Sequence, residues 1–175
     1  MPYFLLVGIH GVGKTTLTNK LKSFINITNL SVSDLIREAG KDIKSGEKFT
    51  QNIENNQNLW KLKLSEYIFS NDEIVLLDGH FTLLNANAEI VELPFSTFDD
   101  IEIKKIILKT EKPEIIKNRL EIRDNKSWAE RLIYDFQEAE IKRAKEFSKL
   151  KNIPIFEIQS DQEIKELIRF IQLRF

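Results

Sequence analysis

Eight residues near the amino end carry the clearest chemistry in the sequence. Gly8-Ile-His-Gly-Val-Gly-Lys14-Thr15 matches the pattern G-x-x-x-x-G-K-[ST] at every position. Glycine lets the main chain approach a polyphosphate closely, and successive N–H groups then point at the anion. Lys14 would place a positive charge on the β- and γ-phosphates, and Thr15 would offer a hydroxyl to Mg²⁺. We expect the nucleotide contacts to come from Gly8, Gly11, Val12, Gly13, Lys14, Thr15 and Thr16.

Asp78 is the natural second half of this site. It follows the four apolar residues 74–77 and should therefore lie at the carboxyl end of a buried strand, where open α/β sheets bind ligands. Mg²⁺ prefers oxygen ligands and keeps several waters, so a carboxylate at this edge can hold it. We expect Thr15 and Asp78 to be the metal contacts, and the alternative interpretation is that Asp78 only begins a turn with Gly79.

The only two histidines, His10 and His80, both fall beside these motifs. His80 is a candidate for orienting Asp78, a water molecule or the acceptor substrate, and we count it as substrate-binding. The alternative for both histidines is that they are polar lining of a loop. Two histidines without cysteine are too few for a structural zinc site.

Three arginines are further candidates. Arg119 and Arg123 are four residues apart, so they share a helix face and can converge on one anion. Arg143 interrupts the apolar stripe of the helix expected over 128–150, and a charge on a buried face requires a partner or a ligand. We therefore list Arg143 as substrate-binding; the alternative is that its head reaches water or pairs with an acid such as Glu140.

The residues around these motifs predict the elements that position them. Short apolar runs predict strands, segments with helical spacing predict helices, and their alternation predicts an α/β fold with a parallel sheet. The residues from 80 to 100 show only scattered apolar positions around Pro94. Ser160 and Glu163 have the spacing of a capping box for a closing helix. Strands are expected over 3–9, 30–32, 74–77, 103–108 and 154–158, and helices over 14–24, from 33, over 53–68, from 113 and over 128–150.

Composition limits the classes of function. The chain has 175 residues, no cysteine and a formal net charge of −1, which is the profile of one domain over residues 1–175. Without cysteine there is no disulfide scaffold, Cys-ligated metal or thiol nucleophile. The charge balance argues against a nucleic-acid partner, and no run of residues is apolar enough to span a membrane. We expect a cytoplasmic protein with small-molecule partners.

Taken together, the motifs resemble those of a known family. The phosphate loop, Ser33-Asp-Leu-Ile-Arg37, Leu77-Asp-Gly-His80 and the segment 119–124 look like the ordered motifs of P-loop nucleoside monophosphate kinases. Adenylate kinases are most similar, especially the short-lid type with an Asp-x-His Walker B motif. The resemblance implies a three-layer P-loop NTPase fold, with a five-stranded parallel sheet of order 2-3-1-4-5 and helices on both faces.

The resemblance also implies roles for the site residues. Arg37 would contact the phosphate of the acceptor, and Arg119 and Arg123 would stabilise the transferred phosphoryl group. The chain departs from the family at residues 80–82, where His-Phe-Thr stands in place of the family's Phe-Pro-Arg. The catalytic set expected from motif and resemblance is Lys14, Asp78, Arg119 and Arg123.

We therefore expect a phosphotransferase that moves the γ-phosphoryl group of MgATP to a small acceptor, such as a nucleoside monophosphate. Positioning and electrostatic stabilisation carry this chemistry, which needs a set of cations and no covalent nucleophile. The alternatives are an ATPase or nucleotide-dependent regulatory module without a small acceptor, and a kinase for a metabolite that is not a nucleotide.

Overall fold

The central sheet confirms the predicted architecture. The computed structural model describes residues 3–38, 60–70 and 73–173, and five of its strands pair in parallel in the order β2-β3-β1-β6-β7. Counted in chain order within this sheet, that is the expected 2-3-1-4-5. The strands are β1 (Tyr3–Val7), β2 (Ile27–Ser31), β3 (Ile74–Gly79), β6 (Ile103–Lys109) and β7 (Ile155–Ile158).

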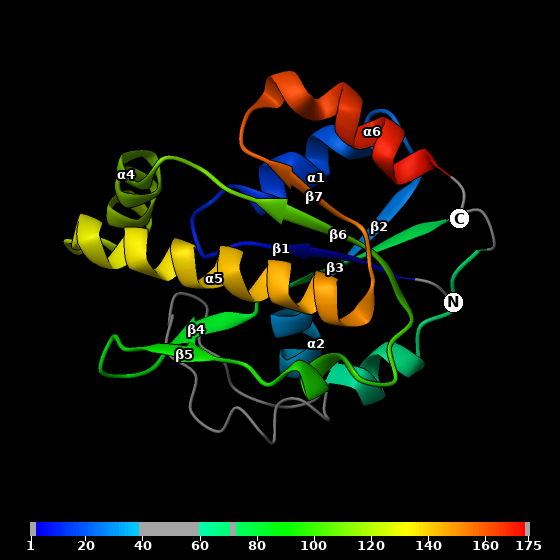
Figure 1. The fold of residues 1–175 in the computed structure, drawn as a ribbon, viewed down its shortest axis with the longest axis horizontal. Coiled ribbons are helices and arrows are strands. Elements are labelled where there is room, and N and C mark those ends of the chain that lie inside the picture. The colour runs from blue at the N-terminus through cyan, green and yellow to red at the C-terminus, as the bar shows by residue number, and fades with distance from the viewer. Residues whose placement is uncertain (1–2, 39–59, 71–72, 174–175) are drawn as a thin grey trace.

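The apolar runs of the central strands β1, β3 and β6 are buried on both faces of the sheet. Side chains alternate between the faces along a strand, so Leu5 and Val7 of β1 join one core cluster, while Phe4 and Leu6 join the other. Helices cover both faces, which gives the three layers seen in Figure 1. The first face is covered by α2 (Val32–Glu38) and α5 (Glu130–Lys151), and the second by α1 (Lys14–Lys22) and α6 (Ile164–Gln172).

A third apolar cluster lies beyond the carboxyl edge of the sheet. It joins the phosphate loop, through Ile9 and Val12, to α4 (Pro113–Asp124) and to the amino-terminal part of α5. Ile116 and Leu120 of α4 are both buried there. The cluster fixes α4 against the loop and so determines where the arginines of α4 lie.

The segment 80–100, for which no element was predicted, folds as a small antiparallel hairpin. Its strands are β4 (Thr82–Leu84) and β5 (Ile90–Glu92), followed by a 3₁₀ turn over Phe95–Phe98. The side chain of Asn85 closes the turn by accepting hydrogen bonds from the backbone N–H groups of Asn87 and Glu89, at 2.9 and 3.0 Å. Strands of three residues are too short to show an alternating pattern, and this turn contains no glycine or proline.

The helix boundaries follow the predictions with small differences. The first helix ends at Lys22 rather than at residue 24, and of the helix expected over 53–68 the stretch 60–65 is helical, while 53–59 lies outside the described residues. The capping box of Ser160 and Glu163 is present and opens a 3₁₀ turn that leads into α6.

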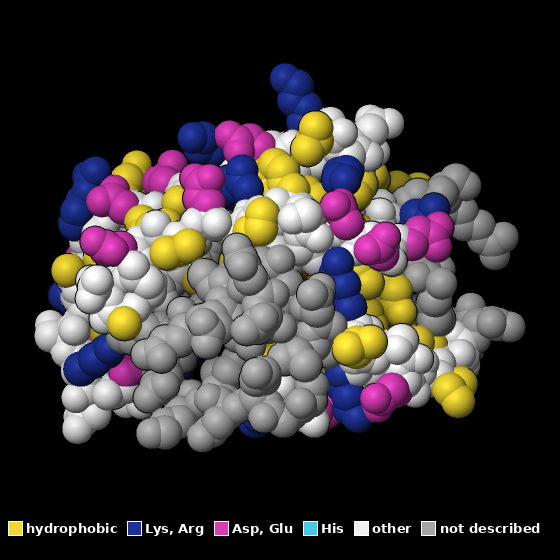
Figure 2. Space-filling view, turned by 90° about the horizontal axis from the view of Figure 1, so that it is seen from below, with side chains coloured by type: hydrophobic (Ala, Val, Ile, Leu, Met, Phe, Trp, Pro, Cys, Tyr) yellow, Lys and Arg dark blue, Asp and Glu magenta, His cyan; other side chains and the backbone are white. Residues whose placement is uncertain are grey.

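The molecular surface agrees with the balanced composition. Basic and acidic side chains are interspersed on the face that Figure 2 views, as expected for a net charge of −1. None of the helices in the part of the chain that the structure describes is long and apolar enough to cross a membrane.

Candidate functional site

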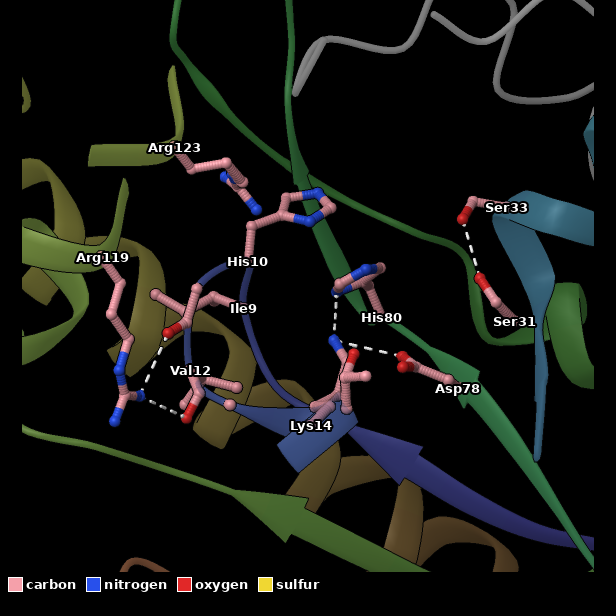
Figure 3. A pocket seen from close by; sticks show the side chains of 13 residues that line it. Ile9, His10, Val12, Lys14, Ser31, Ser33, Asp78, His80, Arg119 and Arg123 are labelled. Atoms are coloured by element: carbon pink, nitrogen blue, oxygen red, sulfur yellow. Dashed lines mark hydrogen bonds and ion pairs between the residues drawn. The ribbon is translucent and has the colours of Figure 1, made fainter. Parts of the chain in front are cut away.

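A pocket of about 280 Å³ opens at the carboxyl edge of the central sheet. Its walls come from the loop between β1 and α1 with the start of α1, from the end of β2 with the start of α2, from the end of β3, and from α4 (Figure 3). This is the edge at which the sequence placed the site. The lining residues are Ile9, His10, Gly11, Val12, Gly13, Lys14, Thr15, Ser31, Ser33, Asp78, His80, Arg119 and Arg123.

The glycines of the phosphate loop are required by its backbone. Gly8, Gly11 and Gly13 have φ angles of +145°, +81° and +101°, in the region that other residues adopt only with strain. A Cβ on Gly8 would collide with the carbonyl oxygen of Lys109, and one on Gly11 would come within 2.9 Å of the Leu120 side chain. The loop is therefore held tightly against β6 and α4.

Lys14 and Asp78 meet inside the pocket. The Lys14 ammonium lies 3.3 Å from Asp78 Oδ1 and 3.4 Å from His80 Nδ1, and it also donates to the carbonyl of Gly8. Burial raises the pKa of Asp78, and the neighbouring Lys14 charge opposes that rise. The loop lysine and the carboxylate at the end of β3 thus form one charged cluster.

The donor set of the pocket fits a magnesium ion. Thr15 and Asp78 both line it, and a hydroxyl and a carboxylate are the hard oxygen ligands that Mg²⁺ accepts beside phosphate oxygens and water. Two of the other predicted loop contacts do not line the pocket: Gly8 is buried, and Thr16 is exposed one residue further along α1.

The two histidines come together across the pocket. The His10 and His80 rings have centroids 4.5 Å apart, with an angle of 50° between their planes. In Figure 3 the Arg123 side chain lies beside His10, from the α4 side. The pocket therefore brings an arginine and two imidazoles to one side of the phosphate loop.

Arg119 and Arg123 both line the pocket, but they are held differently. Arg119 donates to the carbonyls of Gly11 and Val12, at 3.3 and 3.2 Å, and lies 3.4 Å from Glu111. Arg123 forms an ion pair of 2.8 Å with Asp124. Arg119 thus contacts the carbonyl side of the phosphate loop.

The side of the pocket formed by β2 and α2 is lined by two serines that were not predicted as site residues. Ser31 and Ser33 lie at the end of β2 and the start of α2, with their hydroxyls 2.8 Å apart. Their position at the carboxyl end of the second strand is the pattern that could have identified them. Arg37, the predicted acceptor contact, is half-exposed, forms an ion pair with Asp34 and does not line the pocket.

Arg143, which was predicted to bind substrate, does not line this pocket. Its guanidinium donates to the carbonyl of Leu93 at 2.8 Å, approaches Glu92 and Glu146 at 3.4 and 3.3 Å, and lies 3.7 Å from the ring centre of Phe95. This is the alternative in which neighbouring acids satisfy the charge, although the acids differ from the expected Glu140.

Glu140 is a buried acid beside the site, which the sequence suggested only as a partner for Arg143. It is 0% exposed, and its carboxylate accepts hydrogen bonds from the backbone N–H groups of Phe81 and Thr82. Its spacing of four residues from both Phe136 and Ala144 puts it on the buried face of α5. A carboxylate at an otherwise apolar position of the helix pattern is the sequence feature that could have identified Glu140.

The comparisons with known proteins identify the family. The model of the AAA domain matches residues 7–131, which include the phosphate loop, Asp78 and both α4 arginines. The chain belongs to the AAA domain family. This AAA domain is a P-loop NTPase-like protein, a type that includes kinases and ATPases, and nucleotide binding is expected of such a domain.

Among solved structures, the domain is similar to TT1252 from Thermus thermophilus, at 14% identity and a TM-score of 0.52 over 98% of this chain and 95% of that one. At this identity the likeness shows the fold alone. No curated protein matches the chain. The closer resemblance to adenylate kinases stays a prediction.

Proposed function

We propose that this AAA domain is a phosphotransferase that moves the γ-phosphoryl group of MgATP to a small acceptor, in the manner of a nucleoside monophosphate kinase. The observation that carries the proposal is the contact of 3.3 Å between Lys14 and Asp78 within the phosphate-loop pocket. It joins a cation for the β- and γ-phosphates to a carboxylate suited to the metal, as phosphoryl transfer from a magnesium nucleotide requires.

The other lining residues support the same assignment. Thr15 and Asp78 would hold Mg²⁺, which when bound would neutralise charge on the phosphate oxygens. Lys14 would leave Asp78 for the phosphates, since both face the same pocket. Arg123 and His80, which also line the pocket, would face the transferred group and the acceptor.

A second candidate is an ATPase or nucleotide-dependent regulatory module on the same site. Two observations favour it: His80-Phe81-Thr82 replaces the family's Phe-Pro-Arg, and Arg37 lies against Asp34 rather than in the pocket. In that case water takes the place of the acceptor, and nucleotide turnover changes the state of a partner protein.

Calorimetry tests the shared part of both functions. Wild-type protein should bind MgATP, whereas Lys14→Ala should lose binding and reduce turnover by a factor on the order of 10² to 10³. Lys22→Ala is the matched control, because Lys22 is an exposed lysine in the last turn of the same helix. Full activity in Lys14→Ala would refute the assignment.

A coupled assay with a panel of nucleoside monophosphates separates the two candidates. With a kinase, ATP consumption depends on the presence of one particular nucleoside monophosphate. That acceptor is converted to the nucleoside diphosphate. An ATPase consumes ATP at a rate that every acceptor leaves unchanged, and that result would overturn the phosphotransferase proposal while keeping the nucleotide site.

A further inference from the structure

Glu140 is a buried carboxylate that the proposed chemistry does not use directly. It lies on α5, is 0% exposed, and sits on the helix face that packs toward the sheet. A charged group in such a place is costly unless it is fully hydrogen-bonded. Its contacts therefore indicate what it does.

The hydrogen-bond partners of Glu140 in the structure are all donors. The N–H of Phe81 lies 3.0 Å from each carboxylate oxygen, and the N–H and hydroxyl of Thr82 lie 2.7 and 2.6 Å from Oε2. An ionised carboxylate only accepts, so this set of partners suits the charged form. The contacts immediately follow His80 and begin three residues after Asp78.

Stability alone does not explain a carboxylate at this position. Burial raises the pKa of Glu140, with the hydrogen bonds from Thr82 and Phe81 and the charge of Lys14 opposing the rise. The hydrogen bonds therefore do not fully offset the hydration that the charged carboxylate loses on burial. Buried ionic groups are often replaced by apolar residues without loss of stability, which points to a role in geometry.

The other strand at the base of the same hairpin provides a comparison. Arg143, three residues after Glu140 on α5, donates to the carbonyl of Leu93, and the N–H of Leu93 donates to the carbonyl of Phe81 at 2.8 Å. Arg143 and Glu140 thus hold the two sides of the hairpin base. Only Glu140 contacts the segment that leads directly from the site.

We propose that Glu140 is a positioning residue for the nucleotide site: by fixing the peptide groups of Phe81 and Thr82, it holds His80 against Lys14 at the end of β3. The consequence for MgATP rests on the proposed function. The placement of His80 does not, because it concerns the nucleotide-free protein.

The test compares Glu140→Gln with Arg143→Met. A glutamine keeps the size of the side chain but directs an NH₂ group at backbone donors, so the turn after His80 should shift. We expect the imidazole NMR signals of His80 in nucleotide-free Glu140→Gln to move. We also expect affinity for MgATP to fall about tenfold, the lower end of what loss of an outer-shell partner produces. Arg143→Met should lower the melting temperature and leave both readouts unchanged.

The outcomes are distinguishable. Unchanged His80 signals in Glu140→Gln, or equal changes in both variants, would overturn the positioning role. If wild-type protein fails to bind MgATP, the proposed function is wrong, while the His80 signals still decide the role of Glu140. Should Glu140→Gln not fold, Thr82→Val removes one donor to Oε2 and should move the same signals to a smaller extent; no movement there would count against the proposal.

Discussion

Three ionisable side chains lie largely inside the protein and interact electrostatically: Lys14, Asp78 and Glu140. Lys14 contacts Asp78 directly, and its charge opposes the pKa rise of both carboxylates. Each group would be better solvated in the unfolded chain. Such a concentration of buried charge is typical of sites that act on charged ligands.

The raised pKa of Glu140 predicts how stability depends on pH. Between its usual value of 4.5 and the raised value, the unfolded chain has released the proton while the native protein still holds it. The contribution of Glu140 to the free energy of unfolding therefore falls as pH rises through this range. Below the range both states are protonated, and above it both are ionised, so the contribution is constant.

Urea unfolding of wild type and Glu140→Gln from pH 4 to pH 8 measures this effect. The free energy of unfolding of wild type, relative to the variant, should decrease as pH rises from about 4, because only wild type carries the titrating group. A difference that increases with pH would contradict the raised pKa.

The site residues that could be predicted from sequence alone are those that belong to short motifs with defined spacing. Lys14 and Asp78 belong to short patterns with a chemical reason for every position, and the structure places them in one pocket. Ser31 and Glu140 depend on contacts between segments far apart in the chain, which no local pattern records. Arg143 was correctly predicted to need a partner for its charge, but two of its partners, Glu92 and the Leu93 carbonyl, lie in the segment 80–100, for which no element was predicted.

Among the elements, β6 and α6 are joined by a buried lysine. Lys105 of β6 is 3% exposed, and its ammonium donates to the carbonyls of Ile171 and Leu173, at 3.0 and 2.7 Å, and to that of Phe170. The last carbonyls of a helix lack partners within the helix. Lys105 supplies them and so holds the end of α6 on the sheet.

We expect Lys105→Met to destabilise the fold by about 1–3 kcal/mol, because it leaves buried carbonyl groups without donors. Lys104→Met is the control, since Lys104 is a more exposed neighbour and a surface substitution should stay within about 0.5 kcal/mol. Chemical denaturation monitored by circular dichroism measures both. Equal stability of the two variants would show that Lys105 does not support α6.

The helices and strands that the sequence predicted are those whose pattern of apolar residues extends far enough to show strand or helix spacing. The buried strands of the central sheet and the helix α5 carry uninterrupted apolar runs or several turns of helical spacing. The hairpin of β4 and β5 does not, because its strands are three residues each and obtain their place from Glu140 and Arg143 on α5.

At the scale of the whole molecule, the pocket is where separate layers meet. The loop after β1 and the ends of β2 and β3 belong to the sheet, whereas α4 is attached through the third apolar cluster. The order of strands in the sheet was expected from resemblance rather than from spacing, since local patterns do not specify which strands pair. A ligand in the pocket would contact all of these parts at once.

This arrangement predicts that MgATP stabilises the entire fold. A ligand that binds only the native state at 100 times its Kd adds about 2.7 kcal/mol to the free energy of unfolding. For a domain of this size that corresponds to a rise in melting temperature of roughly 5 to 11 °C. Lys14→Ala should show no rise, and wild type with ATP and a chelator should show a smaller one, because Thr15 and Asp78 then have no metal to hold. Thermal unfolding followed by calorimetry measures these shifts. A rise of equal size in wild type and Lys14→Ala would place the nucleotide outside the phosphate-loop pocket.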